Sequence, residues 1–117
     1  MAPLPLLAAF AALIPTVAAP EATLVLSRTH QGTTQVTQLT CAPAGGGHPR
    51  AAVVCEALGP VGGQVSDLAD GNAVCTLQYD PVTVTAAGVW RGEPREFTAE
   101  YANPCLLHAD TGPVFSF

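Results

Sequence analysis

Positive charge is scarce in this sequence. Its 117 residues include no lysine, charged residues make up only 11% of the composition, and the formal net charge is −5. Nucleic-acid-binding proteins need basic side chains to neutralise phosphates, and anionic membrane surfaces also attract basic proteins. The chain therefore fits neither class of partner. Its only cations are Arg28, Arg50, Arg91 and Arg95.

Motifs for catalysis and metal binding are also absent. The sequence has no Gly-x-Ser-x-Gly motif, no phosphate-binding loop and no identifiable pair of acid–base carboxylates. It has no Cys-x-x-Cys pair, and its histidines are scattered, which argues against zinc. We therefore expect a protein that is not an enzyme and that holds neither a metal nor a cofactor. The serines considered as nucleophiles are Ser27, Ser66 and Ser116, and the histidines considered as zinc ligands are His30, His48 and His108.

The first 19 residues have the pattern of a secretory signal peptide. They carry no charge, residues 4–17 are nearly all apolar, and the small residues Ala18 and Ala19 follow. A membrane anchor is the alternative, but prolines interrupt the stretch and it is short for a membrane span. We therefore expect a signal peptide over residues 1–19, secretion to the extracellular space, and one domain over residues 20–117.

Four cysteines fall in this domain, at Cys41, Cys55, Cys75 and Cys105. An even number of cysteines behind a signal peptide predicts two disulfides in an oxidising compartment. Such bonds suit a domain whose single core is only marginally large enough. Three pairings are possible and spacing alone does not choose among them, although proximity along the chain favours Cys41–Cys55 and Cys75–Cys105.

The hydrophobic pattern predicts an α+β fold, with about five antiparallel strands packed with one or two short helices. Phe97, Ala99 and Tyr101 alternate with polar residues and should face the core. Leu24-Val25-Leu26 is apolar throughout, which predicts a strand covered on both faces. Strands are expected at residues 23–27, 35–41, 82–85, 96–101 and 114–117, with a turn at Ala87-Gly88. Helices or helical turns are expected at 50–58, 66–70 and 105–108.

A braced, extended loop is predicted between Cys75 and Pro81. A disulfide at Cys75 would tie one end, while Pro81 fixes its own φ and biases Asp80 toward an extended conformation. Such a loop binds tightly because little conformational entropy is left to lose. Proteases grip extended peptides through backbone pairing and side-chain pockets. Leu77 would fill the primary pocket, which places the Leu77–Gln78 bond at the partner's catalytic serine. Val74, Thr76 and Tyr79 complete the expected protease-binding loop.

Short motifs along the domain point to a known family. They are Leu39-Thr-Cys-Ala-Pro43, His48-Pro49, Val61-Gly-Gly63, Tyr79-Asp-Pro-Val82, Gly88-Val-Trp90 with Gly92, Asn103 before Cys105, and Val114-Phe115 with Phe117. In order and spacing the chain resembles the Streptomyces subtilisin inhibitor family over nearly the whole mature sequence. The resemblance implies a secreted serine protease inhibitor, disulfides Cys41–Cys55 and Cys75–Cys105, the reactive bond Leu77–Gln78, and a homodimer formed through the sheet.

The reactive site departs from the family pattern. Family members often carry proline before the primary residue and Met or Lys as that residue, whereas Thr76 and Leu77 stand here. The string from Cys75 to Tyr79 is similar to the loop of Kazal-type ovomucoid inhibitors, which suggests that the Thr76 hydroxyl bonds the Gln78 amide. Leucine suits the apolar pockets of subtilisin-like and chymotrypsin-like enzymes and predicts weak inhibition of trypsin.

Each loop residue also has a purely structural interpretation. Leu77 could be a core residue of a strand, Val74 could lie partly in the core, Tyr79 could only support the loop, and Asp80 could be a turn residue. Asn103 could bond the loop backbone or merely end a strand. The second interpretation of the whole chain is a secreted, non-inhibitory structural or adhesion module of the same fold.

Overall fold

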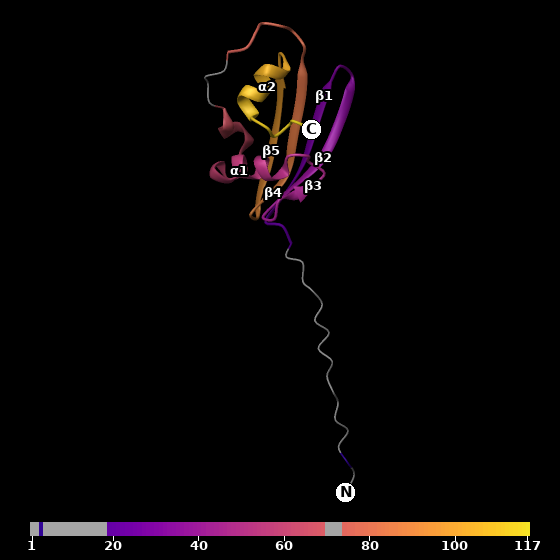
Figure 1. Cartoon of the computed structure of the whole chain (residues 1–117), viewed down its shortest axis with the longest axis vertical. Coiled ribbons are helices and arrows are strands. Elements are labelled where there is room, and N and C mark those ends of the chain that lie inside the picture. The colour runs from indigo at the N-terminus through magenta and orange to yellow at the C-terminus, as the bar shows by residue number, and fades with distance from the viewer. Residues whose placement is uncertain (1–2, 4–18, 70–73) are drawn as a thin grey trace.

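A computed structural model describes Pro3 and residues 19–69 and 74–117. Five antiparallel strands form one sheet, in the order β3-β2-β1-β4-β5, with two α-helices and two short 3-10 helices (Figure 1). The predicted α+β class is therefore confirmed. The elements are β1 (Ala22–His30), β2 (Thr33–Cys41), β3 (Gly45–Gly46), α1 (Ala51–Leu58), η1 (Gly59–Val61), η2 (Val65–Leu68), β4 (Val82–Trp90), β5 (Glu93–Tyr101) and α2 (Pro104–Thr111).

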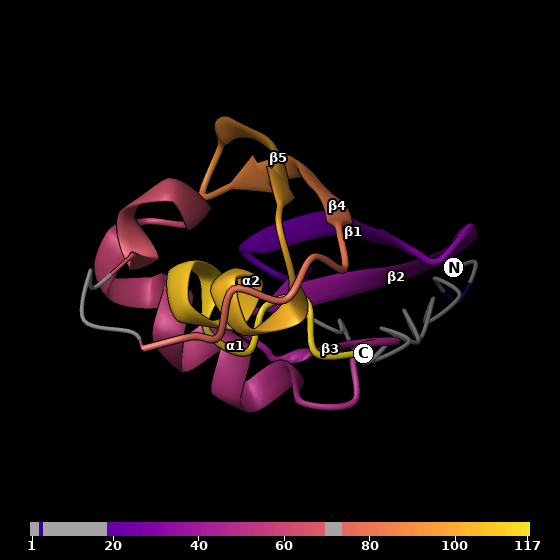
Figure 2. The ribbon, with the colours of Figure 1, turned by 90° about the horizontal axis from the view of Figure 1, so that it is seen from above.

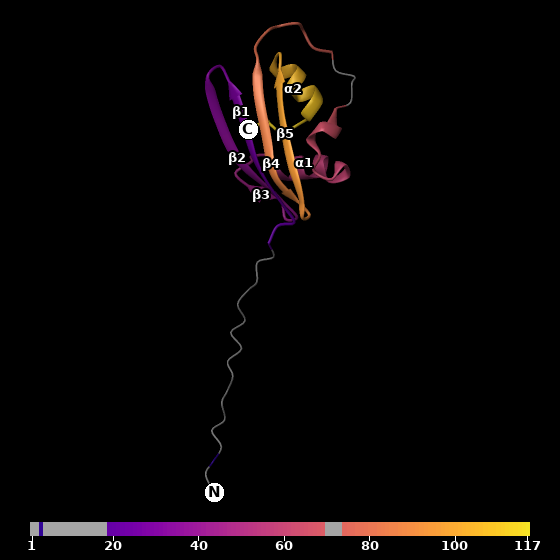
Figure 3. The ribbon, with the colours of Figure 1, turned by 180° about the vertical axis from the view of Figure 1, so that it is seen from behind.

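The helices cover one face of the sheet only (Figures 2 and 3). The register places Leu24 opposite both Leu39 and Gly88, and Leu26 opposite Ala86, on the covered face. Leu24, Leu26 and Leu39 are buried there. Phe97, Ala99 and Tyr101 pack against this core, as their alternation predicts. The other buried apolar residues include Val54, Leu58, Val65, Val82, Val84, Leu107, Val114 and Phe115.

The opposite face of the sheet is open. Val25, between buried Leu24 and Leu26, keeps 49% of its surface exposed, so a single chain covers only one face of β1. Successive side chains of a strand point to opposite faces of the sheet, and diagonal neighbours on paired strands lie within side-chain reach. Val36 and Val89 are such neighbours of Val25 and are exposed as well.

Helix α1 lies on the covered face because two of its apolar residues recur at helical spacing. Val54 and Leu58 are four residues apart and fully buried, since positions i and i+4 share one helix face. The Cys41–Cys55 disulfide joins the helix to the end of β2. The expected helix at residues 50–58 is therefore confirmed, and the chain continues into η1 at Gly59.

The expected turn at Ala87-Gly88 is wrong. Strand β4 continues through it to Trp90, and the hairpin to β5 turns at Arg91 and Gly92, both of which have positive φ. A Cβ at position 88 would lie 2.0 Å from the Thr23 carbonyl oxygen. Glycine here therefore permits close approach of neighbouring backbones inside the sheet, a role that composition does not distinguish from a turn.

The expected edge strand at residues 114–117 is also wrong. This segment forms a tail on the helical side, with Val114 and Phe115 buried in the core. His48 Nδ1 accepts from the Arg50 amide, so its Nε2 carries the proton and donates to the Val114 carbonyl at 2.9 Å. A buried side-chain donor thus replaces the sheet partner that the segment would otherwise need.

Two helical segments differ from expectation, and two expectations lie partly outside the described residues. Helix α2 extends to Thr111, beyond the single turn expected at 105–108, and Ser66 lies inside η2 rather than at its start. The expected turn at 66–70 runs into residues 70–73, which are not described. The predicted signal peptide likewise lies outside the described residues, apart from Pro3 and Ala19.

Candidate functional site

The segment from Val74 to Pro81 arches over α2 into β4, at the end of the sheet where β1 turns into β2 (Figures 1 and 2). None of its residues belongs to a helix or strand. Leu77 is fully exposed, at 101% of its reference surface, and Val74 is exposed at 98%. A leucine held entirely in water contradicts the core interpretation of Leu77, and the same holds for Val74. Both side chains are available to a partner.

A disulfide ties the loop two residues before Leu77. Cys75 is bonded to Cys105 in the first turn of α2, with a Cα–Cα distance of 5.8 Å. The two bonds expected from the resemblance are therefore both present, and no cysteine is free. The loop is thus fixed to the helix that lies beneath it.

A single buried amide holds the backbone on both sides of the Leu77–Gln78 bond. Asn103 is only 3% exposed, and its Nδ2 donates to the Thr76 carbonyl at 3.1 Å and to the Gln78 carbonyl at 2.8 Å. Of the two roles considered for Asn103, bonding to the loop backbone is the one observed. The loop therefore has a preset shape before any partner arrives.

Asn103 keeps its orientation because it also caps α2. Its Oδ1 accepts from the Leu106 amide at 2.9 Å, which is the usual N-cap contact, and Pro104 follows at the first helical position. The carbonyl side of the amide is thereby occupied, and the NH2 group has to point toward the loop. The start of a helix thus determines the position of the exposed loop.

The downstream end of the loop is attached to β5. The Asp80 amide donates to the Ala102 carbonyl at 2.7 Å, immediately before β4 begins at Val82. Pro81 lies between Asp80 and Val82 and fixes its own φ. Tyr79 is largely exposed, so it is available to a partner and does not fill a space beneath the loop.

The proposed bond between the Thr76 hydroxyl and the Gln78 amide is not observed. Both residues are described, and the structure contains no hydrogen bond between them; the Thr76 carbonyl, held by Asn103, is the atom that stiffens the loop.

Burial, followed by the nearby Asp110 carboxylate, raises the pKa of Tyr101, so this side chain stays neutral at physiological pH. Within residues 19–69 and 74–117, no three His, Cys, Asp or Glu side chains come together as a metal site would need. The arrangement can present an extended peptide and supplies no reacting group of its own.

Comparison with known proteins gives consistent matches. The family described as subtilisin inhibitor-like matches residues 17–103. Subtilisin inhibitor-like protein 5 of Streptomyces fradiae is 44% identical over 81 residues, covering 68% of this chain and 76% of that protein. Protease inhibitor SIL-V1/SIL-V4 of Streptomyces netropsis is 37% identical over 94 residues, covering 78% of this chain and 86% of that protein.

Some relatives are longer. A subtilase-type protease inhibitor of Streptomyces fradiae is 44% identical over 82 residues, which cover 68% of this chain but 58% of that protein. Among solved structures, Streptomyces caespitosus sermetstatin in complex with Bacillus licheniformis subtilisin matches with a TM-score of 0.63 and 30% identity. The match covers 82% of this chain and 98% of that one.

Proposed function

Since the chain belongs to the subtilisin inhibitor-like family, which consists of protease inhibitors and not of enzymes, we propose that it inhibits subtilisin-like serine proteases through the bond Leu77–Gln78. One observation carries this proposal. A fully exposed leucine stands between two carbonyls that one buried amide holds in place. Chymotrypsin-like proteases are included as targets because their primary pocket is also apolar.

The mechanism follows from the bracing. Burial of Leu77 in an apolar pocket contributes about 1.5–3 kcal/mol. The protease serine then attacks the Leu77 carbonyl carbon, the bond to the Gln78 nitrogen breaks, and the protease histidine gives that nitrogen a proton. Asn103 and the Cys75–Cys105 disulfide keep both new ends near each other. The amine can therefore attack the acyl-enzyme again before water does, and the complex persists.

The decisive experiment titrates subtilisin with the purified protein and then sequences the ends of any nicked chain. We expect a stoichiometric loss of protease activity and a slow cut after Leu77. Rapid digestion without loss of activity would instead identify the non-inhibitory structural module. A cut at another position would show that Leu77–Gln78 is not the reactive bond.

Substitution of Asn103 tests the loop bonds separately from the helix cap. Asn103→Ser keeps an N-cap oxygen but cannot reach the Thr76 and Gln78 carbonyls. Two lost hydrogen bonds, each worth about 0.5–1.5 kcal/mol, should weaken subtilisin inhibition by about 5- to 150-fold. Asn103→Ala should add about 1 kcal/mol of lost stability through the missing cap. Inhibition constants and urea unfolding measure the two effects, and equal inhibition by all three proteins would contradict the loop role.

We also propose that two copies pair through the open face of the sheet, with Val25 near the centre. On this face β1, β2 and β4 carry threonine, serine, valine, alanine and glutamine and no charged residue, while the edge strand β5 carries Glu96 and Glu100. The uncharged part of the face around Val25 suits a second copy of an acidic chain, because two charged patches of one sign would repel each other. The contact is isologous, since the same patch meets itself.

Val25→Asp should convert the dimer into a monomer, because it places two carboxylates opposite each other in an apolar contact. Sedimentation or light scattering at fixed concentration measures the change. Val53→Asp is the matched control, since Val53 is a comparably exposed valine on α1 and lies away from this face. A monomeric wild-type protein, or equal effects of the two changes, would overturn the proposed dimer.

Secretion completes the proposal and rests on the apolar segment over residues 1–19 acting as a signal peptide. In the described part of the chain, no helix is long and apolar enough to span a bilayer. Two disulfides in the remaining domain suit an oxidising, extracellular compartment. Mass determination of the exported protein would locate the cleavage site.

A further inference from the structure

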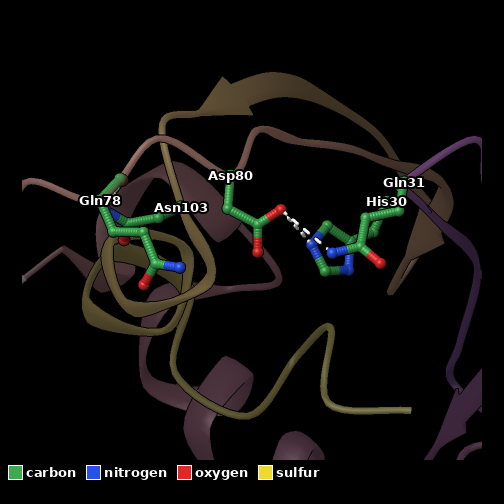
Figure 4. A network of polar contacts seen from close by, with 5 residues as sticks. All are labelled: His30, Gln31, Gln78, Asp80 and Asn103. Atoms are coloured by element: carbon green, nitrogen blue, oxygen red, sulfur yellow. Dashed lines mark hydrogen bonds and ion pairs between the residues drawn. The ribbon is translucent and has the colours of Figure 1, made fainter.

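The turn between β1 and β2 contacts the loop on the side of the leaving group. The Asp80 carboxylate lies 2.9 Å from His30 Nε2 and accepts from Gln31 Nε2 at 3.4 Å. Figure 4 shows the Asp80 side chain directed toward His30 and Gln31, with Gln78 and Asn103 on its other side. None of the family motifs that identify the chain includes His30 or Gln31.

The sheet register explains why these residues meet. His30 is the last residue of β1 and pairs with Val82, the first residue of the adjacent β4. Asp80 precedes Val82 by two residues and therefore extends beyond the strand on the same face, at the diagonal position next to His30. The Asp80 main chain is bonded to Ala102 after β5. Asp80 is thus held from both strands that flank β4.

The histidine has no alternative partner in the described structure. Its Nε2 is buried and forms no well-aligned hydrogen bond, so the carboxylate at ion-pair distance is its polar neighbour. The two side chains are 30% and 24% exposed, which leaves the contact partly shielded from solvent. On the same face of β1, Arg28 is already engaged with Gln35 and the Phe117 carbonyl.

We propose that His30 and Gln31 are positioning residues for the reactive bond, acting through Asp80; this inference rests on the proposed inhibitory function. When the Leu77–Gln78 bond breaks, the new amine of Gln78 belongs to a segment anchored at Asp80. Two extended residues span at most about 7 Å, so this anchor limits how far the amine drifts from the acyl-enzyme. On the other side, Cys75 anchors the acyl segment two residues before the bond. Each new chain end therefore lies two residues from the residue that anchors it.

Substitutions in the full chain test the contact. His30→Phe keeps a ring but removes the nitrogen, and it should speed subtilisin cleavage at Leu77–Gln78 by about 2- to 5-fold, the range for a partly exposed ion pair. His30→Lys restores a donor and should return the rate close to that of the wild type. Asp80→Asn should resemble His30→Phe, and the double variant should be no faster than either single variant because the pair acts as a unit.

Amide hydrogen exchange on the free proteins gives a second measurement without a protease. His30→Phe should raise exchange at Tyr79 and Asp80 while the urea midpoint of the whole domain shifts only slightly, as expected for the loss of one partly exposed ion pair. Equal cleavage rates for His30→Phe and the wild type, failure of His30→Lys to restore the rate, or additive effects in the double variant would each overturn the inference. If the wild type itself does not inhibit subtilisin, the proposed function fails first, and the inference fails with it.

Discussion

A Leu77→Lys variant is expected to gain inhibition of trypsin by about 10- to 150-fold, which corresponds to a hydrogen-bonded charge placed against the buried aspartate of a trypsin-like pocket. The wild-type leucine offers that aspartate no charge, so its inhibition of trypsin should be weak. Inhibition of chymotrypsin should fall by at least about 10-fold, because the burial energy of leucine is lost and a charge enters an apolar pocket. Inhibition constants against trypsin and chymotrypsin measure this change of specificity.

Leu77→Met is the matched control. Methionine has a similar volume and no charge, so inhibition of subtilisin and chymotrypsin should change by less than about 10-fold. Leu77 is fully exposed and contacts no core residue, so all three proteins should unfold at the same urea concentration. Strong inhibition of trypsin by the wild type, through another bond, would show that the reactive bond lies elsewhere.

Removing the loop disulfide is expected to turn the inhibitor into a substrate. In a Cys75→Ser/Cys105→Ser variant the acyl segment loses its bond to α2, so it drifts away after cleavage and water competes with the returning amine. The bond closes a separation of 30 residues, for which loop entropy is about 3.6 kcal/mol. We expect cleavage after Leu77 to accelerate by about 10- to 400-fold. Gel analysis of the nicked chain over time measures this rate.

The second disulfide provides a control of nearly equal thermodynamic weight. Cys41–Cys55 closes a separation of 14 residues, for which loop entropy is about 3.0 kcal/mol, but it joins β2 to α1 away from the loop. Cys41→Ser/Cys55→Ser should therefore lower stability by a similar amount without a comparable effect on cleavage, in buffer where both variants stay folded. Similar cleavage rates in the two variants would mean that general stability, and not bracing of the loop, protects the reactive bond.

Local pattern was enough to predict much of the framework. Alternation identified β5 with Phe97 facing the core, and the spacing of Val54 and Leu58 identified α1. These signals are readable because a strand repeats every two residues and a helix every 3.6. Proline and cysteine around Leu77 indicated the loop in a different way, since each restricts the backbone at its own position.

The predictions at Gly88 and at residues 114–117 were wrong because the contacts that decide these positions come from residues far away in the sequence. Gly88 lies inside a strand because the Thr23 carbonyl passes close to it, and Val114 lies in the core because His48 bonds its carbonyl. The missing hydroxyl bond of Thr76 is a similar case, because Asn103 holds the carbonyl of that residue instead. Composition around positions 88 and 114 contains no trace of these contacts.

The sequence by itself determined the class of fold, the loop and its leucine, because each depends on residue type and short-range order. Only the tertiary structure decided what holds that leucine in place. The amide of Asn103 and the side chain of His30 reach the loop from 25 and 50 residues away in the chain, measured to Gln78 and Asp80. Such contacts depend on strand register and on where a helix begins, and register is a property of paired segments that no single segment encodes.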